Sequence, residues 1–220
     1  MTHQDAGMIR NKTVVYQGRA GAIDCAIDWP DGTPRGWALV LHPNPVQGGT
    51  RDNKVVTTIA RSCVQDGLVA LRPNFRGIGA SEGEFDNGEG EMADMLALVQ
   101  QFADDHPELA GGKWVLGGFS FGTSVGAQLY SELAQHGDRL PDAVILAGSA
   151  IERFNFRTVE LPDDTLLIHG ELDDVVPLSE TLDYARQADL PVVVIPDAGH
   201  FFHGKLIALR RLVEQRLKTL

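Results

Sequence analysis

The sequence predicts an α/β fold of three layers, in which helices cover both faces of a mostly parallel sheet. Short apolar runs, as required by strands buried on both sides, recur along most of the chain. Segments with helical spacing of apolar residues lie between them, and this alternation predicts right-handed crossovers. The apolar runs are 37–41, 68–71, 113–116, 143–146, 165–168 and 191–195, and the helical segments are 53–65, 91–103, 122–134, 178–188 and 205–217.

The first two expected strands, 13–18 and 21–29, are of a different kind. In the second strand, Ile23, Cys25 and Ile27 alternate with more polar neighbours, as in a strand with one face turned to the core. Glycines lie where the two strands would meet, so we expect an antiparallel hairpin at the start of the fold. With this hairpin the sheet should contain seven or eight strands.

Residues 1–220 are expected to form one domain. This length suffices for one sizeable core, and no internal repeat, low-complexity tract or proline-rich linker divides the chain. The one weakly patterned stretch, 148–162, is too short to hold a separate lid domain. We therefore expect a site that is open to solvent.

Composition excludes several classes of partner. The chain has 19 basic and 30 acidic residues, and a net charge of -11 repels nucleic acids and anionic lipid surfaces. Residues 1–12 lack the apolar core of a signal peptide, and no apolar run reaches the ~20 residues that span a bilayer. We expect a cytoplasmic protein with no membrane or nucleic-acid partner, and the oligomeric state is left open. Cys25 and Cys63 resemble small core residues rather than a disulfide or a nucleophile.

A candidate nucleophile follows the expected strand 113–117. This strand runs directly into residues 118–122, which match the Gly-x-Ser-x-Gly pattern of a nucleophile elbow and are followed by a helix. Such a turn would hold Ser120 in a strained conformation, with Gly118 and Gly122 leaving room for neighbouring backbone. The alternative is a glycine-rich turn in which Ser120 only caps the helix. Because a serine hydroxyl is a weak nucleophile, the catalytic interpretation requires a base and a group that orients the base.

An acid and a histidine each follow a separate later strand. Asp173 comes after the run 165–170, and His200 comes after the run 191–196. The order serine, acid, histidine is the one associated with this fold. The sequence therefore predicts a triad of Ser120, Asp173 and His200.

Two backbone amides are candidates for an oxyanion hole. One is the N–H of Phe121, the residue after the nucleophile, and the other should come from the loop after the strand ending at Leu41. Pro43 and Pro45 have no N–H, so between them only Asn44 can donate. The alternative is that this loop is merely rigid.

Several further motifs accompany the elbow at Gly118 to Gly122: His42 to Pro45, Gly48 to Thr50, Asp52 to Lys54, Asn74 to Gly77 and Gly199 to His203. In these motifs, and along nearly its whole length, the chain resembles the α/β-hydrolase superfamily, in particular small bacterial serine hydrolases without a lid. The resemblance implies the α/β-hydrolase fold and a backbone donor just after the position of His42. It also favours Asp173 over Asp174, because in the similar proteins the acid stands three residues after the glycine corresponding to Gly170. Most of those proteins have no assigned natural substrate.

We therefore expect a serine hydrolase that cleaves a small carboxylic ester through an acyl-enzyme, without a cofactor or metal. An acyltransferase or peptidase could use the same triad, and a binding protein could keep the fold without catalysis. His200 and His203 could share a metal, but no carboxylate or thiolate cluster accompanies them. Six phenylalanines lie near the expected site or in the connection 148–162. Some should line an acyl pocket and others should belong to the core, and the sequence does not tell the two groups apart. They are Phe119, Phe121, Phe154, Phe156, Phe201 and Phe202.

Overall fold

The computed structural model describes residues 10–220, and its centre is one sheet of eight strands in the order β1-β2-β4-β3-β5-β6-β7-β8. Strands β1 and β2 form an antiparallel hairpin, β2 also pairs antiparallel with β4, and the remaining pairs are parallel. The predicted fold class is confirmed. The strands are β1 (Arg10–Gln17), β2 (Ala22–Trp29), β3 (Gly36–Leu41), β4 (Leu68–Pro73), β5 (Lys113–Phe119), β6 (Ala143–Ala147), β7 (Leu166–Gly170) and β8 (Val192–Ile195).

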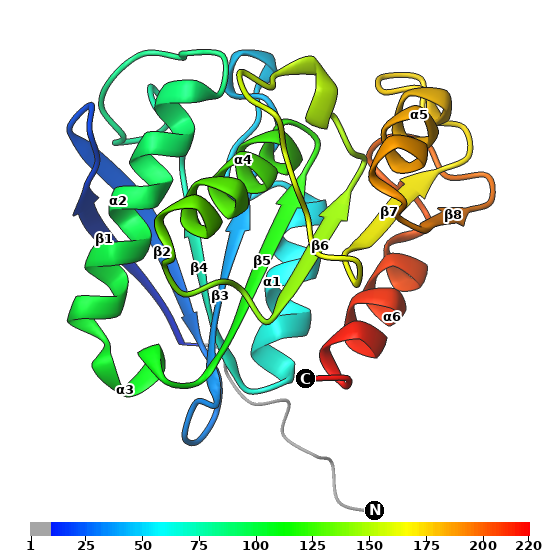
Figure 1. Ribbon diagram of the computed structural model, residues 1–220. Coiled ribbons are helices and arrows are strands. Elements are labelled where there is room, and N and C mark those ends of the chain that lie inside the picture. The colour runs from blue at the N-terminus through cyan, green and yellow to red at the C-terminus, as the bar shows by residue number, and fades with distance from the viewer. Residues whose placement is uncertain (1–9) are drawn as a thin grey trace, which may run out of the picture.

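Helices form the two outer layers (Figure 1). Along β3, Trp37, Leu39 and Leu41 join the core beneath α2 and α4, whereas Ala38 and Val40 join the core beneath α1 and α6. This alternation explains why β3 is apolar at every position: both of its faces are covered. The helices are α1 (Lys54–Gln65), α2 (Glu89–Asp105), α3 (Pro107–Ala110), α4 (Phe121–His136), α5 (Leu178–Ala188) and α6 (Leu206–Leu217).

Three short elements have no counterpart in the sequence prediction: α3 and the 3-10 turns η1 (Pro45–Gln47) and η2 (Ile151–Arg153). Each is about one turn long, which is too short to produce helical periodicity. The connection after β6 contains only η2 before β7 begins. As expected, it forms no lid domain.

The direction in which new strands are added to the sheet reverses at β3, near the centre of the sheet. From β3 the chain adds β4 on one side, and after α2 it adds β5 on the other side. Connections that leave the sheet in opposite directions open a crevice at the carboxyl ends of the strands, where ligands of such folds bind. The loop that contains Asn44 follows β3, and Ser120 follows β5.

Two expectations concern the chain ends and the cysteines. The absence of a signal sequence was inferred from residues 1–12, most of which lie outside the described residues. Cys25 and Cys63 are both buried and unpaired, and burial raises the pKa of the Cys63 thiol to about 12.

Among residues 10–220, no helix is both long and apolar enough to cross a membrane.

Candidate active site

Ser120 occupies a strained turn between β5 and α4. Its φ of 53° and ψ of -121° lie outside the regions that residues with a Cβ normally adopt. The turn is tight: a Cβ on Gly118 would lie 2.6 Å from the Gly122 carbonyl oxygen, and a Cβ on Gly122 would lie 2.5 Å from the Leu41 carbonyl oxygen. The two glycines are therefore required by contact with backbone. Ser120 makes no side-chain hydrogen bond to cap α4.

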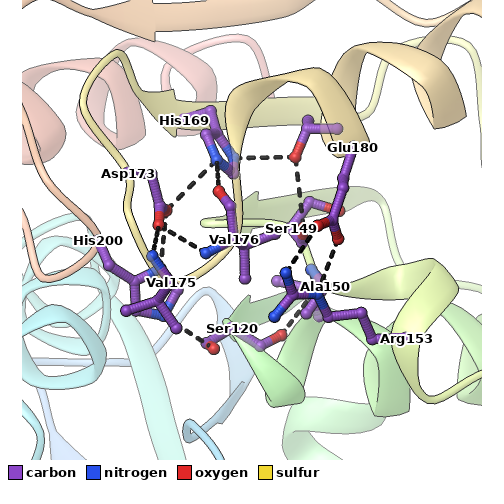
Figure 2. A network of polar contacts seen from close by, with 12 residues as sticks. Ser120, Ser149, Ala150, Arg153, His169, Asp173, Val175, Val176, Glu180 and His200 are labelled. Atoms are coloured by element: carbon purple, nitrogen blue, oxygen red, sulfur yellow. Dashed lines mark hydrogen bonds and ion pairs between the residues drawn. The ribbon is translucent and has the colours of Figure 1, made fainter.

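The structure brings Ser120, His200 and Asp173 together from three loops at the carboxyl ends of the strands (Figure 2). The Ser120 Oγ lies 2.9 Å from His200 Nε2, and His200 Nδ1 lies 2.7 Å from Asp173 Oδ2. Because a carboxylate accepts, Nδ1 carries the proton and Nε2 can accept from the serine hydroxyl. Both ring nitrogens of His200 are thus engaged, which leaves neither free to share a metal with His203.

Asp173 is fixed by its own turn as well as by His200. Its Oδ1 accepts hydrogen bonds from the N–H groups of Val175 at 3.0 Å and Val176 at 2.7 Å. Burial opposes the charge, but the hydrogen bonds from His200 and Val176 outweigh it, and the pKa of Asp173 is lowered. Asp174 is exposed to solvent. Asp173, and not the adjacent Asp174, is therefore the acid that contacts His200.

Asn44 lies where the loop after β3 folds into η1. Its Oδ1 accepts from the Val46 N–H at 3.0 Å, and its carbonyl accepts from the Gln47 and Gly49 N–H groups at 3.1 and 2.9 Å. Within residues 10–220, no acceptor takes a hydrogen bond from the N–H of Asn44 or of Phe121. Neither amide is therefore committed to a partner in the described part of the chain.

The side chain of His42 links this loop to the turn that follows β4 through two hydrogen bonds. Its Nδ1 donates to the Pro43 carbonyl at 2.7 Å, and its Nε2 accepts from the Phe75 N–H at 2.9 Å. Burial lowers the pKa of His42 to about 4, so the ring stays neutral and can both donate and accept. In the sequence, His42 is recognisable only as part of a motif. Its role depends on contact with a turn that follows another strand.

The predictions also missed His169, which lies at the end of β7. Its side chain is fully buried, and its Nε2 is 3.3 Å from Asp173 Oδ2. A polar residue within an otherwise apolar strand, just before the loop that carries the acid, was the available signal. The spacing of motifs alone gives such a residue no role.

The structure divides the phenylalanines near the site. Phe119, Phe121 and Phe202 are fully buried in the core, whereas Phe201 is 45% exposed. The ring centre of Phe201 lies 5.1 Å from that of His200 in an edge-on arrangement. Phe201 is therefore the phenylalanine that both contacts the site and faces solvent. It also lines a hollow of about 220 Å³ with Asn53, Lys54, His203, Gly204 and Leu206.

A larger cavity lies elsewhere. It measures about 740 Å³ between residues 151–161 and α5, and none of Ser120, Asp173 and His200 lines it. A nucleophile next to a base is a better indicator of chemistry than volume, so we place the candidate site at Ser120. In residues 10–220, no cluster of three histidine, cysteine or acidic side chains is arranged to hold a metal.

Comparison with known proteins identifies the family. No family model matches the sequence. Uncharacterized protein RP471 of Rickettsia prowazekii (strain Madrid E) is 30% identical over 191 residues, which cover 83% of this chain and 79% of that protein.

Two solved structures are similar in both sequence and fold. XC6422 from Xanthomonas campestris, described as an α/β serine hydrolase without a lid, is 31% identical with a TM-score of 0.83, over 95% of this chain and 94% of that one. An α/β serine hydrolase homologue from Coxiella burnetii is also 31% identical, with a TM-score of 0.78, over 96% of this chain and 100% of that one. With the sheet and the elbow described above, these similarities show that the chain belongs to the α/β serine hydrolases that lack a lid.

Proposed function

We propose that this hydrolase cleaves a small carboxylic ester through an acyl-enzyme intermediate, with Ser120, His200 and Asp173 as the catalytic triad. The observation that carries the proposal is the 2.9 Å contact between Ser120 Oγ and His200 Nε2, in a ring whose other nitrogen is held by Asp173. The base is thus within hydrogen-bond reach of both the nucleophile and the orienting acid. No cofactor is required for this chemistry.

In the first half-reaction, the Ser120 Oγ attacks the ester carbonyl carbon while His200 Nε2 takes the hydroxyl proton. The carbonyl oxygen becomes an oxyanion, which the N–H groups of Asn44 and Phe121 bind together with the positive end of the α4 dipole. The C–O bond to the leaving group then breaks. His200 gives its proton to the leaving oxygen, so an alcohol departs and an acyl group remains on Ser120.

In the second half-reaction, water attacks the acyl carbon and His200 takes one of its protons. Collapse of the new tetrahedral intermediate breaks the bond to Ser120 Oγ, to which His200 returns the proton, and the carboxylic acid leaves. Asp173 remains ionised throughout. It holds the Nδ1 proton in place and stabilises the imidazolium that forms twice in each cycle.

Covalent labelling tests the assignment of the nucleophile. A fluorophosphonate should add a single adduct, and peptide mass spectrometry should locate it on the peptide that contains Ser120. Pre-labelling should abolish turnover of a short-chain nitrophenyl ester, because the modified oxygen can no longer attack. Active protein in which Ser120 remains unlabelled would contradict the proposal.

A substrate panel separates ester hydrolysis from the related activities of the same triad. Matched oxygen ester, amide and thioester substrates should be compared, each with and without an added alcohol as a second acceptor. We expect the ester to have the highest kcat/KM and the free acid to be the product. A preference for the amide would indicate a peptidase, acyl transfer to the alcohol would indicate an acyltransferase, and no turnover at all would favour a binding protein.

Phe201 is expected to contact the apolar part of the substrate. In the Phe201→Ala variant we expect kcat/KM for a hexanoyl ester to fall about tenfold relative to an acetyl ester, equivalent to ~1.4 kcal/mol of lost apolar contact. Phe156→Ala is a matched control, since Phe156 is similarly exposed, at 40%, but has no ring contact with His200. Equal losses for the two esters would show that Phe201 does not contact the acyl chain.

A further inference from the structure

His169 lies beside the proposed triad but takes no part in the steps above. Its side chain and that of Asp173 are both fully buried. The His169 Nε2 lies 2.8 Å from the Val176 carbonyl oxygen, and its Nδ1 lies 3.0 Å from Thr181 Oγ1 (Figure 2). A buried imidazole with a partner at each nitrogen is therefore packed against the catalytic acid.

The partners of His169 define its tautomer. A carbonyl can only accept, so Nε2 must carry a proton and donate it to Val176. In a neutral ring Nδ1 is then an acceptor, and the Thr181 hydroxyl donates to it. Burial lowers the pKa of His169, although the Val176 carbonyl and Asp173 act in the opposite direction. The ring is thus expected to be neutral at neutral pH.

The Val176 residue connects His169 to the acid. Its N–H donates to Asp173 Oδ1 at 2.7 Å, and its carbonyl accepts from His169 Nε2. His169 itself lies on β7, which is paired with β6 on one side and β8 on the other. The imidazole therefore ties the turn that orients Asp173 to a strand that is paired on both sides.

The network can also accept a proton without losing a hydrogen bond. The Thr181 Oγ1 lies 3.3 Å from the Ser149 carbonyl oxygen. If His169 takes a second proton, Nδ1 can donate to Thr181, and the hydroxyl can turn to donate to Ser149. A His169 cation would then lie 3.3 Å from the same Asp173 oxygen that holds His200 Nδ1 at 2.7 Å. Both N–H groups of this cation are donated to Val176 and Thr181, so its positive charge is what would attract the carboxylate, in competition with His200.

We propose that neutral His169 is a positioning residue for Asp173, and that its protonation in acid draws the carboxylate away from His200 and lowers activity. The inference rests on the proposed triad. The titratable and charged groups that face His169 are Asp173, His200 and Glu180, and Glu180 is itself paired with Arg153 at 2.7 Å. Because burial lowers the pKa of His169, the activity that depends on the neutral ring is present above that pKa and is lost as pH falls through it.

Two substitutions test separately the N–H donor of His169 and the ability of its ring to take up a proton. Leucine removes the N–H donor, and His169→Leu should lower kcat about 10²-fold with KM nearly unchanged, because a displaced acid affects the chemistry and not substrate contacts. Glutamine offers an N–H donor but takes no proton, so His169→Gln should retain most of kcat. Equal kcat in His169→Leu and the wild type would overturn the proposal.

The pH profile gives a readout that a purely structural role would not change. In the wild type, protonation of His169 should contribute to the loss of activity on the acid side. The acid limb of log kcat/KM should therefore be steeper by one unit of slope in the wild type than in His169→Gln. The isosteric Thr181→Val removes the acceptor for the second proton, so the additional proton should bind only at lower pH. Identical acid limbs in the three proteins would contradict the inference.

Imidazole NMR tests the coupling without turnover. In the wild type, the ¹⁵N signals should show a proton on His169 Nε2 and on His200 Nδ1, and the His200 Nδ1–H signal should shift as His169 titrates. This shift should be absent in His169→Gln at the same pH. If esters are not cleaved, the proposed function fails while this coupling can still be measured. A His200 signal that responds alike in both proteins would overturn the coupling itself.

Discussion

Ser120→Ala is expected to lower kcat for a short-chain nitrophenyl ester about 10⁶-fold, with little change in KM. The substitution removes the atom that forms the acyl bond, but the amides of Asn44 and Phe121 and the substrate contacts remain. Steady-state kinetics over a range of substrate concentrations measures both constants. Residual activity above the uncatalysed rate is expected, because the amides that we propose to bind the oxyanion are unchanged.

Ser124→Ala, in the first turn of α4, provides the matched control. Ser124 is fully buried one turn after Ser120, and its hydroxyl donates to the Ile151 carbonyl at 3.2 Å. Its loss should cost ~1 kcal/mol of stability and little kcat. If Ser120→Ala retained a substantial fraction of activity while remaining folded, the nucleophile would have to be another group.

Asp173→Asn is expected to lower kcat about 10⁴-fold in a folded protein. The amide is nearly isosteric, but it can present a donor to His200 Nδ1 and thereby favour the wrong tautomer, in which Nε2 cannot accept from Ser120. The neighbouring Asp174→Asn should retain most activity, since Asp174 is exposed to solvent. Measuring kcat for both variants, with circular dichroism as a test of folding, checks the prediction. The reverse ranking would move the acid of the triad to Asp174.

Much of the fold follows from local patterns in the sequence. Parallel strands such as β3 are apolar throughout because both faces are covered, so they stand out from the amphipathic helices between them. The N-terminal hairpin was recognisable because its second strand alternates. Short elements such as α3 and η1 escaped prediction, because one turn stabilised by loop contacts leaves no periodic signal.

Some residues of the candidate site could likewise be predicted from the sequence, and others could not. Ser120, Asp173 and His200 each follow a strand, so their meeting at one edge of the sheet could be inferred from connectivity. The roles of His42 and His169 depend on contacts with turns that are distant in sequence or hidden in the core. The same limit applies to the phenylalanines: Phe201 and Phe202 are adjacent in sequence, but one is 45% exposed and the other is fully buried. Only packing distinguishes them.

The strand order also implies that the two sides of the candidate site, one carrying Ser120 and the other carrying His200, differ in local stability. Ser120 follows β5, which is paired on both sides, whereas His200 follows β8, an edge strand of four residues that pairs only with β7. Opening one edge of a sheet costs less free energy than unfolding the whole domain. Such a fluctuation would carry the proposed base away while the nucleophile and its amides stay in place. The proposed binding of an oxyanion would therefore persist while the fold persists, whereas the proposed proton transfer would also require β8 to stay paired with β7.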